Sequence, residues 1–169
     1  SVVAKLAVDA LGPKKILAVL MPDTSTPEEC MTDARAMAEE WGIEVLDIKI
    51  KPMVDAISDT LECEDKASLG NVKSRSRMVI LYHQAREKHL LVLGTGNKSE
   101  ILTGYFTKWG DGASDLCPIG DLYKTQVRKL AGKIGIPKKV VDRVPSGDLW
   151  PGQTDEAELG IDYETLDRI

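Results

Sequence analysis

The feature that most constrains the fold is an aliphatic run that follows a segment of helical pattern. Residues 15–21, KILAVLM, are apolar except for the first. Such a run is typical of a strand in a parallel sheet that is covered on both faces. Residues 1–11 before it carry apolar side chains at helical spacing, and Gly12 and Pro13 end that pattern. The opening segment therefore indicates an α/β fold.

The alternation of helix and strand continues along the chain. Thr26 is expected to cap a helix that starts at Pro27 and runs to about Trp41. Residues 43–50 alternate apolar and polar side chains, which predicts a strand nearer the sheet edge. Further helices are expected at residues 52–61, 70–88, 123–134, 137–141 and 163–169, a third strand at 89–93, and turns over 144–156. This order predicts a parallel three-layer α/β domain.

Composition excludes several classes of protein. The 169 residues suffice for one domain with a core, and the net charge of -5 argues against non-specific binding of nucleic acid. Three widely spaced cysteines (Cys30, Cys63 and Cys117) and two histidines (His83 and His89) argue against a zinc site or a disulfide framework. No apolar run approaches the ~18 residues of a membrane span, and no signal peptide opens the chain. A cytoplasmic protein with reduced thiols is expected.

Residues 93–124 combine glycines with many different functional groups. Six glycines interrupt this stretch, and between them lie Thr95, Glu100 and Lys108. A loop that only connects two elements needs turn formers and not this variety of side chains. Open α/β sheets bind ligands at the carboxyl ends of their strands, and this stretch follows the third expected strand. It is therefore the expected wall of an active site.

Thr95 and Glu100 admit two interpretations. A threonine hydroxyl beside exposed backbone amides suits phosphate oxygens, and a nearby carboxylate suits Mg²⁺, which prefers one or two carboxylates plus substrate phosphates. Alternatively, Asn97 or Ser99 caps a helix and Glu100 only favours its dipole. The local residues leave both open.

The basic residues also allow two interpretations, because each could bind a ligand or could be solvated at the surface. Arg75 and Arg77 are two positions apart, so they lie on different faces of a helix and are not expected to share a ligand. Arg77 precedes an apolar run and could reach inward, or it could belong to a solvated basic patch. Lys108 and Lys124 could be surface lysines, but glycines flank both, and glycine lets a backbone approach a ligand closely.

The remaining polar and aromatic candidates are also ambiguous. Asp115 is either a turn residue or an acceptor for ribose or amide groups. Ser146 is either a turn former or a ligand contact, and Trp109 and Trp150 either stack on a base or pack in the interior. No Ser-His-Asp or Cys-His arrangement is visible. The inventory favours a reaction driven by positioning and charge neutralisation, as in nucleotidyl transfer.

Four segments of the chain resemble the ammonia-dependent NAD synthetase family. They are residues 69–78 (LGNVKSRSRM), 93–115, 118–131 and 145–164, and the pattern GTGNKSE…TGYFTKxGDG is highly specific. The likeness runs over residues 1–169, which would form a single NAD synthetase domain. It implies the Rossmann-like three-layer α/β/α fold, with a parallel sheet, of the adenine nucleotide alpha hydrolase type found in N-type ATP pyrophosphatases.

The resemblance also implies an activity. Family members use ATP to adenylate the nicotinate carboxylate of deamido-NAD, and ammonia then displaces AMP to give NAD, with pyrophosphate as the other product. The implied cofactor is Mg²⁺, with ATP as co-substrate. The implied assembly is a tight homodimer with the dinucleotide at the interface. Neither nucleic acid nor a membrane is an expected partner.

Residue by residue, the resemblance assigns roles to seven positions. Thr95 and Lys124 would contact the ATP phosphates and serve catalysis, and Ser146 would also contact ATP. Glu100 would hold Mg²⁺. The turn at residues 21–22 would lie near the adenine. Three residues match the family's deamido-NAD contacts: Arg77, Lys108 and Asp115.

Two departures from the family pattern qualify the expected activity. The family's Ser-Gly-Gly-x-Asp-Ser phosphate loop would precede Ser1, and its C-terminal helices would follow Ile169. We therefore expect a domain truncated at both ends that is inactive or very weak alone, whereas a full-length relative would be active. The alternatives are a non-catalytic nucleotide-binding module or another N-type ATP pyrophosphatase, such as a GMP synthetase-like domain or a tRNA-thiolating enzyme.

Overall fold

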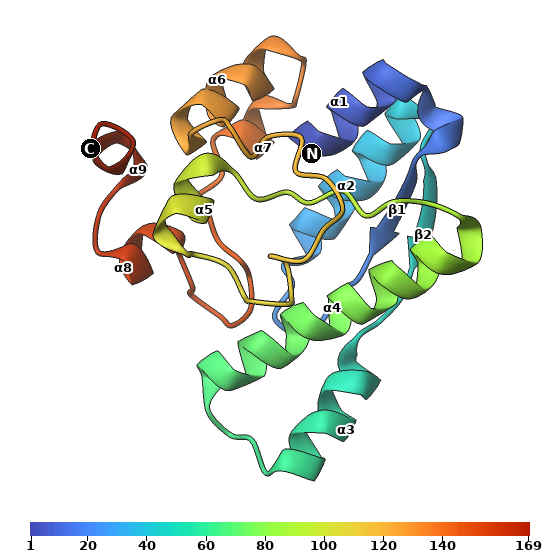
Figure 1. Cartoon of the computed structure of the whole chain (residues 1–169), viewed down its shortest axis with the longest axis vertical. Coiled ribbons are helices and arrows are strands. Elements are labelled where there is room, and N and C mark those ends of the chain that lie inside the picture. The colour runs from blue at the N-terminus through green and yellow to red at the C-terminus, as the bar shows by residue number, and fades with distance from the viewer.

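The computed structural model describes residues 1–169, in which a small parallel sheet lies among helices (Figure 1). The first half contains α1 Val2–Leu11, a 3₁₀ turn at Pro13–Lys15, β1 Leu17–Leu20, α2 Glu28–Trp41, β2 Glu44–Asp47, α3 Lys51–Leu61 and α4 Lys66–Lys88. The second half contains α5 Lys98–Thr103, α6 Lys124–Lys133, α7 Lys138–Val141, α8 Asp155–Leu159 and α9 Tyr163–Leu166. No helix combines the length and the apolar character needed to cross a membrane.

The sheet consists of β1 and β2, which pair in parallel with Leu17 opposite Glu44 and Leu20 opposite Asp47. Helix α2 packs on both strands. The prediction that β1 is fully covered is wrong, because its four residues are only half-buried. The physical reason is that β1 has a paired neighbour on one edge alone.

The third expected strand, residues 89–93, is not a strand in the structure. It makes one isolated parallel bridge, between Leu93 and Leu116. The backbone N–H of Val92 donates to the side chain of Asp115 at 2.7 Å, so a carboxylate takes the place of a ladder partner. His89, with a φ of 56°, ends α4 in the left-handed region and reverses the chain just before this segment.

Two local expectations differ from the structure. Thr26 does not cap α2, because its hydroxyl accepts a hydrogen bond from the Asp23 N–H at 3.0 Å and so closes the preceding turn. The turn-rich segment 144–156 runs into helix α8, which its turn-forming residues did not predict. Thr154 caps α8 by accepting from the N–H of Ala157.

Two apolar clusters hold the layers together. One joins α1, α6 and the segments beside α6, through Val2, Val3, Ile119, Ala131 and Ile136. The other joins Ile50, Val54 of α3 and Ile80 of α4, and Val19 of β1 packs against it. Helices α3 and α4 pack against each other, and α3 projects from the rest of the molecule while α4 runs across it (Figure 1). The cavity described below lies alongside α4.

Gly94 is required where two segments approach each other closely. Its N–H donates to the carbonyl of Leu116 at 2.7 Å, and an added Cβ would lie 2.5 Å from Ser114 Oγ and 3.0 Å from Cys117 Sγ.

We predict that Gly94→Ala lowers the free energy of unfolding by ~1–3 kcal/mol, because the two segments must separate to make room for the added methyl group. Gly132→Ala on α6 is the control, since nothing lies within 4 Å of its added Cβ, and it should stabilise by ~0.5–1 kcal/mol. Urea unfolding measures both, and equal stabilities for the two variants would contradict the prediction.

Candidate functional site

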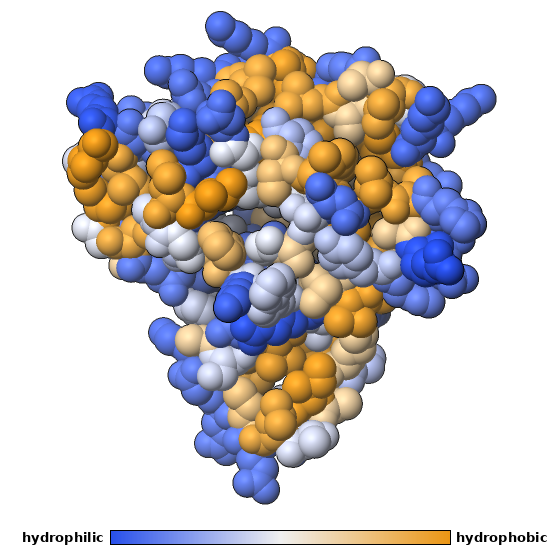
Figure 2. All heavy atoms as spheres, in the orientation of Figure 1, coloured by the Kyte–Doolittle hydropathy of each residue, from blue (hydrophilic) through white to orange (hydrophobic).

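A cavity of about 720 Å³ lies between α4, the segment that follows residue 92, the start of α6 and residues 146–158. Five of the seven residues singled out from the sequence line it: Arg77, Thr95, Glu100, Lys124 and Ser146. They come from segments that are far apart in the chain. This face of the molecule mixes hydrophilic and hydrophobic side chains around the cavity region (Figure 2). The structure therefore gathers most of the predicted residues around one hollow.

Glu100 both caps α5 and faces the cavity. Asn97 Oδ1 accepts from the Glu100 N–H at 3.1 Å, and Glu100 Oε2 accepts from the Asn97 N–H at 3.0 Å. This reciprocal pair is a capping box. The other oxygen, Glu100 Oε1, lies 2.8 Å from Lys124 Nζ. The capping interpretation is therefore confirmed, and it leaves one carboxylate oxygen for the cavity.

Lys124 is the first residue of α6 and reaches two carboxylates. Its Nζ lies 2.8 Å from Glu100 Oε1 and 3.5 Å from Asp155 Oδ2, and 5.0 Å from the centre of the Tyr163 ring. Sequence reasoning missed Asp155, which lies at the start of α8. The pattern Thr154-Asp-Glu was a helix-start signal that could have placed it.

The Tyr163 hydroxyl holds Asp155 in place, and the Tyr105 hydroxyl lies beside it. Tyr163 Oη donates to Asp155 Oδ2 at 3.0 Å, and Tyr105 Oη lies 3.4 Å from Asp155 Oδ1 and 2.6 Å from Glu158 Oε2. Burial, reinforced by the neighbouring carboxylates, raises the pKa of both tyrosine hydroxyls above its ordinary value. Both therefore remain hydrogen-bond donors at neutral pH.

Arg77 brings an unpaired positive charge to the cavity. Its Nε donates to the carbonyl of Met21 at 3.2 Å, and it forms no ion pair. Burial lowers the pKa of the guanidinium, against the opposing effect of nearby carboxylates such as Asp23, yet an arginine stays charged in proteins. Arg75 is exposed and donates to the carbonyl of Lys108. The expectation that the two arginines face different ways is confirmed.

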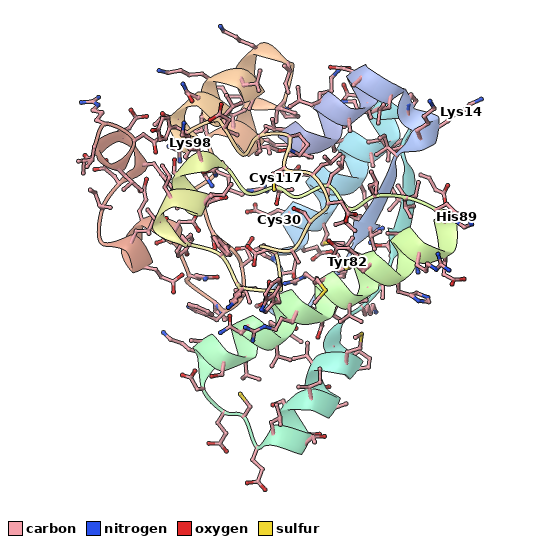
Figure 3. All side chains as sticks on the ribbon, in the orientation of Figure 1. Lys14, Cys30, Tyr82, His89, Lys98 and Cys117 are labelled. Atoms are coloured by element: carbon pink, nitrogen blue, oxygen red, sulfur yellow. The ribbon has the colours of Figure 1, made fainter.

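Lys108 and Asp115 lie outside the cavity. The Lys108 ammonium is exposed, 5.5 Å from the centre of the Trp109 ring. Asp115 Oδ2 accepts from the N–H of Val92, and Asp115 Oδ1 lies 3.5 Å from the hydroxyl of Tyr82. Tyr82 projects from α4 toward the segment that carries Cys117 (Figure 3). The structure therefore does not bring these two residues into one hollow with Arg77.

Ser146 and Trp150 line the cavity from the C-terminal side. Ser146 Oγ accepts from the N–H of Asp148 at 3.0 Å, so the turn-former interpretation holds while the residue also faces the hollow. The Trp150 ring packs against the backbone of α4 at Gly70, where an added Cβ would lie 2.9 Å from Trp150 Cζ3. Trp109 is two-thirds exposed.

A buried ion pair that sequence reasoning missed ties together two sides of the cavity. Lys73 Nζ lies 2.5 Å from Asp23 Oδ2 and donates to the carbonyl of Leu149 at 2.6 Å. The side chains of Lys73 and Asp23 are 12% and 3% exposed. Ser25 Oγ in turn donates to the carbonyl of Asp148 at 2.9 Å. The turn after β1 is thereby fastened to the segment that carries Ser146 and Trp150.

The carboxylates of the cavity fit a divalent cation only together with ligand oxygens. No three His, Cys, Asp or Glu side chains are grouped as a metal site. Glu100 and Asp155 already hold one positive charge, the Lys124 ammonium, between them. Mg²⁺ is commonly bound by one or two carboxylates and substrate phosphates, so the donor chemistry of this corner fits it.

Comparison with known proteins decides the family. The sequence profile described as NAD synthase matches residues 1–169. The chain belongs to the NAD synthase family. Its adenine nucleotide alpha hydrolase-like α/β fold is shared with solved structures of this family.

The chain spans about two thirds of the length of similar proteins in the NAD synthase family. The NH(3)-dependent NAD(+) synthetase of Pyrococcus horikoshii is 51% identical over 168 residues, which are 99% of this chain and 65% of that protein. The structure of NMN synthetase from Francisella tularensis matches with a TM-score of 0.92 at 38% identity, over 98% of this chain and 69% of that one. The NH3-dependent NAD synthetase of Campylobacter jejuni matches with a TM-score of 0.78 at 36% identity, over 82% and 60%.

The Asp23–Lys73 pair predicts a pH-dependent stability. Burial alone would raise the pKa of Asp23, but hydrogen bonds from Lys73, the Thr24 N–H and Ser25 outweigh it and lower the pKa to about 2. Because the folded-state pKa lies below the unfolded value of 3.8, the stabilisation is complete above pH 4 and is lost as the pH falls towards 2. We predict that Asp23→Asn destabilises by about 2 kcal/mol at pH 6.

The measurement is urea unfolding of wild type and Asp23→Asn from pH 6 down to pH 2. The gap between the two proteins should close mainly below pH 4. Asp121→Asn is the control, because Asp121 is 96% exposed although it pairs with Lys98, and surface pairs contribute little. A gap for Asp23→Asn that is constant with pH would contradict the prediction.

Proposed function

We propose that this chain carries the synthetase site of an enzyme that amidates deamido-NAD with ammonia, at the expense of ATP, to give NAD, AMP and pyrophosphate. The observation that carries the proposal is the shared hollow of Thr95, Glu100, Lys124 and Ser146 in a member of the NAD synthase family. The volume of about 720 Å³ is within the range of small-molecule sites. Free ammonia is the proposed nitrogen donor, in line with the names of the Pyrococcus relatives.

The cavity residues suit adenylation of a carboxylate. A nicotinate carboxylate is a poor electrophile. Its attack on the α-phosphorus of ATP would release pyrophosphate and form an adenylate, from which ammonia would then displace AMP. No protein nucleophile is needed. Lys124 and Arg77 would stabilise negative charge on the phosphates, since fixed cations act strongly where charge develops. Thr95 and Ser146 offer hydroxyls for phosphate or ribose oxygens.

Glu100 is the proposed protein ligand of Mg²⁺. When bound, the cation would neutralise phosphate charge and polarise the oxygens it contacts. Its oxygen Oε2 is held by the N–H of Asn97, so Oε1 is the atom that would face the cation. The capping box therefore orients the ligand oxygen into the cavity.

Lys108 and Asp115 are proposed to bind deamido-NAD outside the ATP cavity, at the interface of a homodimer. Exposed apolar residues near them support a covered surface: Val79, Leu91, Trp109 and Leu116. Arg77 lines the cavity, so its proposed contact with deamido-NAD would be made there, at the nicotinate end where the two substrates meet.

The proposed location of the protein is the cytoplasm. Its three free cysteines agree with a reducing compartment.

The second candidate reaction uses a mononucleotide. The Francisella tularensis structure is named an NMN synthetase and matches this chain with a TM-score of 0.92. Nicotinate mononucleotide, in place of deamido-NAD, is therefore the alternative substrate.

The test supplies the chain with ATP, Mg²⁺, ammonium and either deamido-NAD or nicotinate mononucleotide. Chromatography measures AMP, NAD and NMN, with the Pyrococcus horikoshii relative as the reference. AMP and NAD that form only with deamido-NAD would support the proposal, and NMN formation would favour the alternative. A rate of AMP and NAD formation far below that of the reference would agree with the weak activity expected from the sequence. ATP binding by calorimetry with no detectable AMP under any condition would instead indicate a nucleotide-binding module.

Two lysines of α6, one inside the cavity and one outside it, test the role of the Lys124 charge. We predict that Lys124→Met lowers the rate of AMP formation by ~100-fold, because a cation that stabilises developing charge is worth that much in a catalytic site. Lys129→Met on the same helix is the matched control, because Lys129 is exposed and lies outside the cavity. Product chromatography gives both rates. Equal losses in the two variants would show that Lys124 has no special role.

A further inference from the structure

The Lys124 ammonium faces more negative charge than it can neutralise. Glu100 and Asp155 both point at it, and their side chains are only 17% and 6% exposed. One unit of positive charge against two carboxylates leaves the cluster with a net negative charge in a poorly solvated place. That excess of negative charge would attract a second cation.

Both oxygens of Glu100 already accept a hydrogen bond. Oε2 accepts from the N–H of Asn97, whose position is fixed by the backbone, and Oε1 accepts from the ammonium of Lys124, whose side chain can move. A divalent cation on Oε1 would lie within a few ångströms of the ammonium if Lys124 did not move. Like charges at that distance repel strongly in a partly buried site, so binding at Glu100 requires the ammonium to leave.

Asp155 is built to receive the ammonium. Its Oδ2 lies 3.5 Å from Lys124 Nζ, beyond the usual 2.7–3.2 Å of a direct N–H···O bond. A rotation of the flexible lysine side chain toward Asp155 would complete that bond and would move the ammonium away from Glu100 Oε1. The carboxylate is anchored by the hydroxyl of Tyr163, and the N–H of Asp155 donates to the carbonyl of Pro145. The Tyr163 ring, 5.0 Å from Nζ, lies beside both positions.

We propose that Asp155 is a positioning residue that takes over the Lys124 ammonium when Glu100 binds a divalent cation. Lys124 then remains in the cavity with its charge directed at the phosphates, and it does not compete for the metal ligand. This inference rests on the proposed function. It concerns the side chains of this chain alone, and Asp155 contacts neither metal nor substrate in it.

The first experiment measures coupling between the two carboxylates without any metal. Urea unfolding is followed for wild type, D155N, E100Q and the double variant. With Glu100 neutralised, Asp155 becomes the sole carboxylate partner of a mostly buried ammonium. We expect D155N to lower the folding equilibrium constant ~10-fold more in the E100Q background than alone, within the range of coupled neighbours. Additive effects would overturn the inference.

The second experiment follows Mn²⁺ by electron paramagnetic resonance in the presence of α,β-methylene ATP, which cannot transfer AMP. D155N should raise the Mn²⁺ dissociation constant ~10-fold, as loss of a residue that orients a metal site does. E158Q is the matched control, because Glu158 accepts from the same Tyr105 hydroxyl but forms no ion pair with Lys124. It should change the constant less than ~3-fold, the through-space effect of one charge.

The variant Y163F and the behaviour of the wild-type chain complete the test. Y163F removes one hydroxyl that anchors Asp155 and should weaken Mn²⁺ binding by less than D155N does, which covers the case in which D155N does not fold. An unchanged Mn²⁺ affinity in Y163F and D155N would overturn the inference. A wild-type chain that binds neither Mn²⁺ nor the analogue would overturn the proposed function and the inference together. Wild-type binding with additive unfolding energies would overturn the inference alone.

Discussion

The cavity depends on one ammonium group placed between two carboxylates from different parts of the chain. Lys124 starts α6, Glu100 lies in α5 and Asp155 opens α8. The backbone between these short helices is largely irregular, so regular hydrogen bonding cannot fix their relative positions. A mostly buried charge supplies the missing constraint, because moving any one partner away leaves another charge unpaired in a poorly solvated place. The segments that form the cavity therefore hold their positions partly through the charges that its chemistry would use.

A second charge pair performs the same task on the opposite side. Lys73 holds Asp23 of the turn after β1 and the carbonyl of Leu149 at once. The turn signals in both segments indicated irregular backbone but not which distant residue would order it. Long-range pairs of this kind join residues with no sequence relation to each other, so a reading of periodicity and capping cannot find them.

Local patterns predicted what local physics determines. The helix over Glu28–Trp41 and the parallel pairing of Leu17–Leu20 with Glu44–Asp47 follow from spacing and composition. A cap at Asn97 or Ser99 was one of two open interpretations, and the structure has it at Asn97. The strand expected at residues 89–93 failed, since an aliphatic run has no way to show that the side chain of Asp115 will take its N–H group. Resemblance to a family added Ser146 and Lys124 to the cavity, which spacing alone left as a turn former and a surface lysine. It also grouped Lys108 with Arg77, and of these two only Arg77 lines the cavity.

The contact between α4 and Trp150 has a consequence for the size of the hollow. The indole lies against bare backbone at Gly70, so one wall of the cavity stands where it does because that helix position has no side chain. Any larger residue there would move the ring inward and narrow the space open to a ligand, without touching a polar group. The room available to a base or a nicotinate ring is in this sense determined by the hydrogen atom that stands in place of a side chain at Gly70, a position with no polar side-chain group to offer a ligand.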